Sequence, residues 1–335
     1  MAKATITDVA AKAGVSAGTV SNVLNGTRQV TEQKRARVME AIRELGYVPD
    51  AWARNLRAQT SRTIGICLPH TSSAYLAALL DAFEEGAVLA QHQIMQVFTR
   101  NDPVREADRV RALLAQKIAG LIIVPSLDPS EALAAVADAG VPAVIVDRPT
   151  GGAHDEVSFD NRSAMSEATA ALIARGHKRI LFTAQYPQLG VTRDRLAGFR
   201  AAMDGAQLQS GGRLLAAGED EGSFAQRLAE VLHGKEPPTA VIASNSRLAL
   251  WSLRAFAAHG IRHPEAVSLL AFDEPEWASI LTPRLATVRH PTAEIARRAW
   301  QLLSGRIAGE SAPPERIVLK ATVEIRGSVV DIRRN

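Results

Sequence analysis

The N-terminal part of the chain alternates apolar and polar residues with the spacing of one helix face, in two short runs. The first run begins at Thr5, which forms a capping pattern with Asp8 three residues later, and it ends at Gly14. Ser16 is suited to cap the second run, which stops at Asn25-Gly26. The pattern predicts two short helices joined by a turn of about three residues, which is helix-turn-helix spacing.

A third run of helical spacing follows, capped by Thr31 and closed by Gly46 and Pro49. Three amphipathic helices of this length can share one small core. The residues expected in that core are Ile6, Val9, Ala10, Ala13, Val20, Val23, Leu24, Val38, Ala41, Ile42 and Leu45.

The polar face of the second helix carries the candidate chemistry of this segment. Asn22 is able to pair with an adenine edge through two hydrogen bonds, whereas Ser16, Thr19 and Ser21 are better suited to phosphates. The predicted contacts to DNA are Thr5, Ser16, Ala17, Gly18, Thr19, Ser21, Asn22, Asn25 and Thr31. The pattern alone fits a small protein-interaction bundle equally well.

From Thr63 onward, short apolar runs alternate with amphipathic helical stretches, which is typical of parallel α/β sheets. The expected strands are Thr63–Leu68, Ile94–Phe98, Leu121–Val124, Ala143–Val146, Arg179–Thr183, Ala240–Ala243 and Ser268–Ala271. The expected helices include Leu76–Ala90, Ala107–Gln116, Ser163–Arg175 and Arg247–His259. These units fit one large sheet or two.

The composition separates the N-terminal segment from the rest. The first 60 residues hold 9 Lys and Arg against 5 Asp and Glu, and the remaining residues hold 30 of each. A basic arm on a neutral body favours nucleic acid over protein as the partner of the three helices.

Length and composition limit the class of protein. A chain of 335 residues with 47% hydrophobic residues is expected to form two or three globular units. It has no run of roughly 20 apolar residues and no apolar signal core near its start, so we expect a cytoplasmic protein with no membrane partner. The single cysteine, Cys67, lies in an apolar run and is expected to pack in a strand.

The longer motifs resemble a known family. Ile6–Ser16, Thr19–Gly26 and Ala41–Pro49 closely resemble the headpiece of the lactose-repressor/galactose-repressor (LacI/GalR) family of transcriptional regulators. The resemblance extends through the body, at Gly120–Ile123, Val146–Pro149, Arg175–Ile180 and Leu281–Pro283.

The resemblance implies an N-terminal all-α helix-turn-helix headpiece (residues 1–48), a hinge helix or linker (49–61) and an α/β bilobed periplasmic-binding-protein-like effector domain (62–335). One lobe would comprise about 62–160 and 291–321, and the other about 161–290 and 322–335, with crossovers near Asp160, His290 and Ala321. By the same resemblance Leu56 is a minor-groove wedge, and Arg54 and Arg57 contact phosphates. Trp52 stands where the family has a smaller aliphatic residue.

A small effector is expected between the lobes, at the carboxyl ends of the strands. The candidate contacts are His70, Ser72, Ser73, Tyr75, Arg148, Asp160, Arg193, Arg195, Asn245, Asp273 and Trp277. The family pattern favours Arg195, Asn245 and Asp273 in particular. The arginines and the histidine favour an anionic effector such as a sugar acid, with a neutral sugar or a nucleobase as alternatives.

Two departures from the family separate this site from a known sugar site. Ser246 stands where the family commonly has an aspartate. Ser72-Ser73-Ala74-Tyr75 represents the family's Ser-Asn-Pro-Phe motif. A known sugar specificity therefore does not transfer directly to this chain.

An enzyme and a periplasmic solute-binding protein are the competing interpretations. The sequence has no glycine-rich phosphate loop and no serine-elbow motif, and breaks at Gly260 and Pro264 separate His259 from His263. The sequence therefore argues against an enzyme, and we predict no catalytic residue, metal or cofactor in this chain. An export signal at the start of the chain would indicate a solute-binding protein, but the predicted DNA-binding helices occupy that position. We predict a homodimeric regulator, most simply a repressor, that binds a near-palindromic double-stranded operator under control of the effector.

Overall fold

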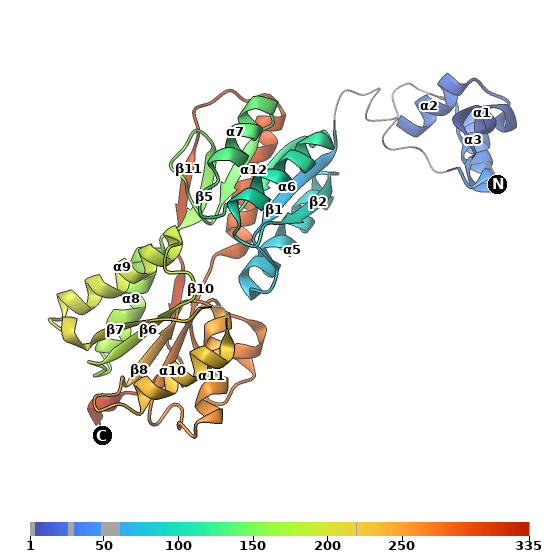
Figure 1. Ribbon diagram of the computed structural model, residues 1–335. Helices are drawn as coiled ribbons and strands as arrows, with labels where there is room; N and C mark the ends of the chain where they lie inside the picture. Colours follow the sequence, from blue (N-terminus) through green and yellow to red (C-terminus); the bar gives the residue numbers. More distant parts are fainter. Residues whose placement is uncertain (1–3, 26–29, 48–60, 219, 335) are drawn as a thin grey trace. The chain divides into compact units, whose positions relative to one another are not determined.

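The structure is a computed structural model that describes residues 4–25, 30–47, 61–218 and 220–334. The chain forms two compact units, residues 1–61 and residues 62–335, which are described separately (Figure 1). Among the described residues, no helix is long and apolar enough to cross a membrane.

The headpiece contains three helices, α1 (Ile6–Ala13), α2 (Ala17–Asn25) and α3 (Glu32–Leu45). The capping box predicted at Thr5 is present, and Ser16 Oγ accepts from the Thr19 backbone N–H at 3.1 Å. Gly14 and Gly46 end α1 and α3 in the left-handed region, at φ of 61° and 58°. Thr31 occupies the N-cap position of α3, but its side chain makes no capping hydrogen bond, so that part of the prediction is wrong.

The headpiece core matches the predicted apolar positions. Its buried members are Val9, Ala10, Ala13, Val20, Val23, Val38 and Ala41. The other predicted members, Ile6, Leu24, Ile42 and Leu45, are partly buried against them. The periodicity in the sequence therefore identified the faces that hold the three helices together.

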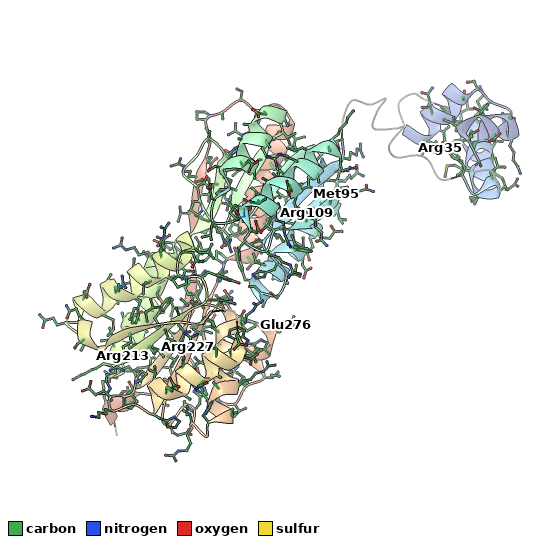
Figure 2. The ribbon with its side chains drawn as sticks, in the orientation of Figure 1. Arg35, Met95, Arg109, Arg213, Arg227 and Glu276 are labelled. Atoms are coloured by element: carbon green, nitrogen blue, oxygen red, sulfur yellow. The ribbon has the colours of Figure 1, made fainter. Side chains whose placement is uncertain are left out.

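The body contains two six-stranded sheets. The first has the order β11 (Arg316–Leu319), β5 (Asp155–Phe159), β4 (Ala143–Val146), β3 (Gly120–Ile123), β1 (Thr63–Leu68), β2 (Gln93–Phe98). The second has the order β12 (Thr322–Glu324), β10 (Ala286–Arg289), β9 (Ser268–Phe272), β8 (Ala240–Ala243), β6 (Ile180–Ala184), β7 (Gly212–Ala216). All neighbouring strands run parallel except β10 and β12. On the edge strands, Met95 and Arg213 are exposed (Figure 2).

Helices cover both faces of each sheet (Figure 1). On the first sheet, α5 (Ala74–Leu89) and α12 (Thr292–Ile307) cover one face, and α6 (Pro103–Ala115) and α7 (Ser130–Ala139) cover the other. On the second sheet, α8 (Asn161–Ile173) and α9 (Gly190–Gly205) lie opposite α10 (Glu221–Leu232) and α11 (Ser246–Ala258). Short 3-10 helices span η1 (Gln209–Gly211), η2 (Glu276–Ser279) and η3 (Ile332–Arg334).

The chain passes from one sheet to the other between β5 and α8, between β10 and α12, and between β11 and β12. Each sheet with its helices forms one lobe, called here the first lobe and the second lobe after their sheets. One apolar core runs through both, from Ile64 of β1 to Phe272 of β9. The two lobes are thus packed against each other at the three crossovers.

Candidate functional site

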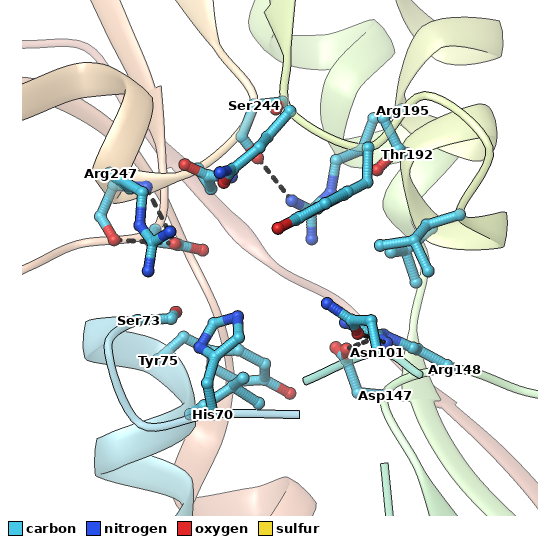
Figure 3. Close-up of a pocket in the computed structure, with 18 residues that line it drawn as sticks. His70, Ser73, Tyr75, Asn101, Asp147, Arg148, Thr192, Arg195, Ser244 and Arg247 are labelled. Carbon is cyan, nitrogen blue, oxygen red and sulfur yellow. Dashed lines mark hydrogen bonds and ion pairs between the residues drawn. The ribbon is translucent and has the colours of Figure 1, made fainter. Parts of the chain in front are cut away.

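A pocket lies where the carboxyl ends of strands from both sheets meet (Figure 3). The first lobe contributes loops that follow β1, β2 and β4, and the second lobe contributes loops that follow β6, β8 and β9. Parallel strands place their carboxyl ends at one edge, which explains why residues so distant in sequence line one cavity.

Seven of the residues predicted to contact an effector line this pocket. They are His70, Ser73, Tyr75, Arg148, Arg195, Asn245 and Asp273. The rule that strand-end loops carry the site therefore brings together most of the candidates.

Four predicted contacts lie outside the lining. The Asp160 side chain accepts from the Ser163 N–H and caps α8. Arg193 is exposed, because it lies two residues before Arg195 on α9 and so points to a different side of the helix. Trp277 packs against the apolar core under α11, and the Ser72 hydroxyl hydrogen-bonds to neighbouring side chains beside the pocket.

The structure adds polar lining residues that the sequence analysis did not select. They are Asn101, Asp147, Gln185, Tyr186, Thr192, Ser244, Ser246 and Arg247. Gln185 comes directly after β6 and Asn101 is the third residue after β2, so the strand-end rule applied to every strand would have found them.

Arg195 is a buried cation in the second lobe. Its Nε donates to Asn161 Oδ1 at 2.7 Å, and its Nη1 donates to the Ser244 carbonyl at 2.6 Å. The guanidinium carbon lies 3.8 Å from the centre of the Phe272 ring. Both hydrogen-bond acceptors and the ring are neutral, and the carboxylates of Asp273 and Asp147 act on Arg195 from beyond hydrogen-bond distance (Figure 3).

Asp273 is a buried carboxylate on the same side. It accepts from the Ser246 N–H at 3.0 Å and from the Ser246 hydroxyl at 3.1 Å, and His290 Nε2 lies 2.8 Å from its other oxygen. Burial alone would raise the pKa of Asp273, but the hydrogen bond and charge of His290, with help from Arg195, hold that pKa below its ordinary value. Asp273 is therefore ionised at neutral pH.

The wall formed by the first lobe is centred on Arg148. Its Nη1 donates to Asn101 Oδ1 at 2.6 Å and to the Pro125 carbonyl at 2.7 Å, and its Nε lies 3.8 Å from Asp147 Oδ2. Asn101 and Asp147 adopt positive φ angles of 61° and 69°, and Asp273 across the pocket has φ of 78°. Non-glycine residues adopt this region at an energetic cost, and such residues cluster at ligand sites.

Several polar atoms in the lining are buried without a hydrogen-bond partner of acceptable geometry among the described residues. They are Tyr75 Oη, Asp147 Oδ1, Arg148 Nε and Gln185 Nε2. Burial and the nearby Asp147 carboxylate raise the pKa of Tyr75 well above its ordinary value, so the phenol stays neutral. Such groups are costly unless a bound molecule satisfies them.

The described part of the chain contains no group of three or more His, Cys, Asp or Glu side chains arranged to hold a metal ion. The pocket therefore offers hydrogen bonds and charges to a ligand, and the described residues provide no metal centre.

In the headpiece, the second helix presents small residues to solvent. Ala17 and Gly18 are exposed, and Ser21 and Asn22 are partly exposed. The hydroxyls of Thr5 and Ser16 take part in helix caps. The side chain of Asn25 lies outside the described residues, and so do Arg54, Leu56 and Arg57 of the predicted hinge.

Comparison with known proteins gives the family. A model of bacterial regulatory proteins of the lacI family matches residues 5–50, and a periplasmic binding protein-like domain model matches residues 169–329. The transcriptional repressor PurR of Vibrio atlanticus is 31% identical over 91% of this chain and 92% of its own length. The chain belongs to the LacI family. Another member, the transcriptional regulator CelR of Thermobifida fusca, is 33% identical over 97% of this chain and 98% of its own.

Solved structures of the family share the architecture. A lac repressor dimer bound to operator and the anti-inducer ONPF has a TM-score of 0.87 at 26% identity, covering 98% of this chain and 100% of that one. The complex of CelR with cellobiose has a TM-score of 0.71 at 28% identity, covering 97% and 100%. These relatives are transcriptional regulators and not enzymes, and this LacI-family chain is a DNA-binding transcriptional regulator with an α/β effector domain.

Proposed function

We propose that this regulator represses transcription from a near-palindromic operator and that a small polyhydroxylated effector, a sugar or sugar acid, controls its affinity for the operator from the pocket in the body. The observation that carries the proposal is the set of buried polar atoms in the lining that have no hydrogen-bond partner of acceptable geometry among the described residues. Gln185 Nε2 and Arg148 Nε are donors, Asp147 Oδ1 is an acceptor and Tyr75 Oη is both. A ring of hydroxyl groups can satisfy all four.

The arrangement of the lobes supports control by the effector. The pocket takes residues from both lobes, and Tyr75 of the first lobe packs on His290, with 4.0 Å between ring centres, while His290 contacts Asp273 of the second. A ligand that touches both lobes changes the relative stability of their arrangements. Operator and effector must then alter each other's affinity by the same factor.

Homodimerisation is part of the proposal, and exposed apolar side chains support it. Val88, Leu89, Met95 and Phe98 lie on α5 and β2 of the first lobe, and Ile280 follows η2 in the second. Ile280 is 81% exposed and Leu89 is 86% exposed. A second copy of the chain would cover such residues and would place two headpieces on two half-sites. Light scattering of the purified chain would measure the mass directly.

A thermal-shift screen of sugars, sugar acids and nucleobases would identify the effector class, followed by fluorescence anisotropy on an operator selected from a random duplex library. Arg195→Lys is expected to weaken effector binding by roughly tenfold or more, because a lysine loses the fixed fork that meets Asn161 and Ser244. Arg193→Ala on the same helix is the matched control and should bind normally. If a compound stabilises the protein but leaves operator affinity unchanged, the proposed switch is wrong.

A further inference from the structure

The charges that line the pocket do not balance. Three arginines, Arg148, Arg195 and Arg247, face two aspartates, Asp147 and Asp273. Asp147 lies 3.8 Å from Arg148, and Asp273 is engaged by His290 and Ser246. Within the described part of the chain, neither Arg195 nor Arg247 has a carboxylate oxygen within 4.0 Å. Counted over the lining residues alone, the formal excess is one positive charge; the buried carboxylate of Glu106, which is hydrogen-bonded to Ser126, acts on Arg148 from outside the lining.

Arg247 lies at one end of the pocket among neutral donors. It is the second residue of α11, and its guanidinium donates to the Ser72 hydroxyl of the first lobe. The Ser72 hydroxyl lies 3.1 Å from His70 Nδ1, and Ser73 also lines the pocket. Figure 3 shows Arg247 extending toward His70 and Ser73. We call these four residues the Arg247 corner: His70, Ser72, Ser73 and Arg247.

The histidine of the corner does not add a second charge at neutral pH. Burial, followed by the charges of Arg247 and Arg148, lowers the pKa of His70 to about 4. The corner therefore combines one fixed cation with an uncharged imidazole and two hydroxyls. The backbone N–H groups at the start of α11 add positive potential at the same end of the pocket.

We propose that the effector is anionic, and that the Arg247 corner binds its carboxylate while the rest of the pocket binds its hydroxyl groups. The inference rests on the proposed function and narrows the effector to a sugar acid. A planar guanidinium presents two parallel N–H donors that match a carboxylate. The serine hydroxyls of the corner can donate to the same group. Arg195, Asp147 and Gln185 are then left for the hydroxyls of the sugar.

The charge excess selects a carboxylate over a phosphate. A carboxylate brings one negative charge, which equals the excess in the lining. A phosphate monoester brings about 1.5 to 2 negative charges at pH 7. That second charge would face Asp147 and Asp273 in a partly buried site. A neutral sugar would leave Arg247 without an anionic partner.

The position of Arg247 also connects effector binding to the lobes. Its hydrogen bond to Ser72 joins the second lobe to the first across the pocket. A carboxylate held by both residues replaces one direct bond by two charge-assisted ones. The anionic group of the effector would therefore connect the two lobes directly and stabilise the arrangement in which both contact it.

Isothermal titration calorimetry with the full chain tests the inference through matched pairs: D-gluconate and D-glucuronate against D-glucose, D-galacturonate against D-galactose, and D-glucose 6-phosphate as the phosphate probe. We expect at least one acid to bind roughly tenfold or more tightly than its neutral partner, since charge-assisted hydrogen bonds are about twice as strong as neutral ones. The preference should weaken as salt is added.

Variants then assign the preference to the corner. Arg247→Gln should abolish the advantage of the acid over its neutral partner, and Arg247→Lys should retain part of it. Arg254→Gln is the matched control, because Arg254 lies on the same helix, is exposed, and pairs with Glu221 outside the pocket. Operator anisotropy with the bound acid should respond in wild type and in Arg254→Gln.

The outcomes separate the inference from the proposed function. If a neutral sugar or the phosphate binds best, or if Arg247→Gln keeps the preference for the acid, the inference is wrong while the proposed function stands. If no sugar, sugar acid or sugar phosphate binds or alters operator affinity, the proposed function is wrong as well. The wild-type comparison of acid and neutral partner decides the charge question even if a variant does not fold.

Discussion

Substitution of Gly198 tests whether the close packing of α9 on α8 stabilises the second lobe and positions its pocket residues. Gly198 lies in the middle of α9, where this helix packs directly on α8. A Cβ atom at Gly198 would lie 2.1 Å from the Arg162 carbonyl oxygen and 3.1 Å from the Ser166 nitrogen, both of them backbone atoms. Non-bonded heavy atoms prefer separations of about 3.5 Å, so alanine at this position must push the helices apart by roughly 1 Å.

We expect Gly198→Ala to destabilise the body. Overpacking costs typically about 1–3 kcal/mol, and the upper part of that range applies here because a backbone carbonyl cannot rotate away as a side chain can. The gain in helix propensity from glycine to alanine offsets up to about 1 kcal/mol. A net loss of about 2 kcal/mol lowers Tm by roughly 4–8 °C for a domain of this size. Effector binding should weaken as well, because α8 carries the Asn161 oxygen that holds Arg195 Nε at 2.7 Å.

Gly205→Ala is the matched control for this experiment. Gly205 ends the same helix, and no atom of a packed neighbour lies within 4 Å of the position that its Cβ would take. Thermal unfolding followed by circular dichroism should show a lower Tm for Gly198→Ala and an equal or higher Tm for Gly205→Ala. Equal melting temperatures for the two variants would refute the close helix contact on which the prediction depends.

Two further predictions concern the headpiece and pH. Val38 is fully buried in the headpiece core, so Val38→Ala should lower the free energy of unfolding of the headpiece by about 2 kcal/mol. Calorimetry should show an unchanged unfolding transition for the body, and anisotropy should show weaker operator binding. Unchanged operator affinity would contradict the assignment of DNA binding to the headpiece. His70 has a pKa of about 4 in the folded chain against an ordinary value of 6.5, so the unfolded chain binds more protons between these values and the body should lose stability as pH falls through this window. Urea unfolding at several pH values should show a smaller loss for His70→Gln, and an identical loss would count against the burial of His70.

Most interior strands of the body were predictable, because each is a short apolar run buried on both faces. Strand β5 was missed because it begins with Asp155 and Glu156, which read as a polar segment. Both residues are nevertheless buried: Arg306 donates two hydrogen bonds to Asp155, and Arg316 lies 3.4 Å from Glu156. These arginines are about 150 residues or more away in the chain, so no local pattern reveals that the strand is buried.

Three strands at sheet ends, β7, β11 and β12, were missed for a different reason. β12 has three residues, and β7 and β11 each have no fully buried position and include an exposed arginine. An edge strand buries less apolar surface than an interior one, and the apolar signal in its sequence is correspondingly weak. The division of the strands between two sheets followed from the family resemblance and not from periodicity.

The pocket shows the same division between local and distant information. The rule that ligands lie at the carboxyl ends of parallel strands located His70, Arg148 and Asn245 from sequence alone. It also selected Arg193, because a sequence position near a strand end does not say which side of α9 a residue faces. Arg247 was missed, although it immediately follows Asn245 and Ser246, because its relation to Ser72 depends on how the two lobes meet.

The crossovers explain why a ligand in this pocket is suited to change the arrangement of the lobes. His290 stands at the end of β10, where the chain leaves the second sheet, and Phe159 ends β5, where the chain leaves the first. Their rings lie 4.4 Å apart, and the His290 ring also packs on Tyr75 and pairs with Asp273, both of which line the pocket. A ligand that displaces Tyr75 or hydrogen-bonds to the Asp273 carboxylate therefore acts on His290 and Phe159. These residues lie at the crossovers, which must bend when the angle between the lobes changes. Because the apolar core is continuous through these segments, a small displacement there favours a different packing of the lobes over a local adjustment.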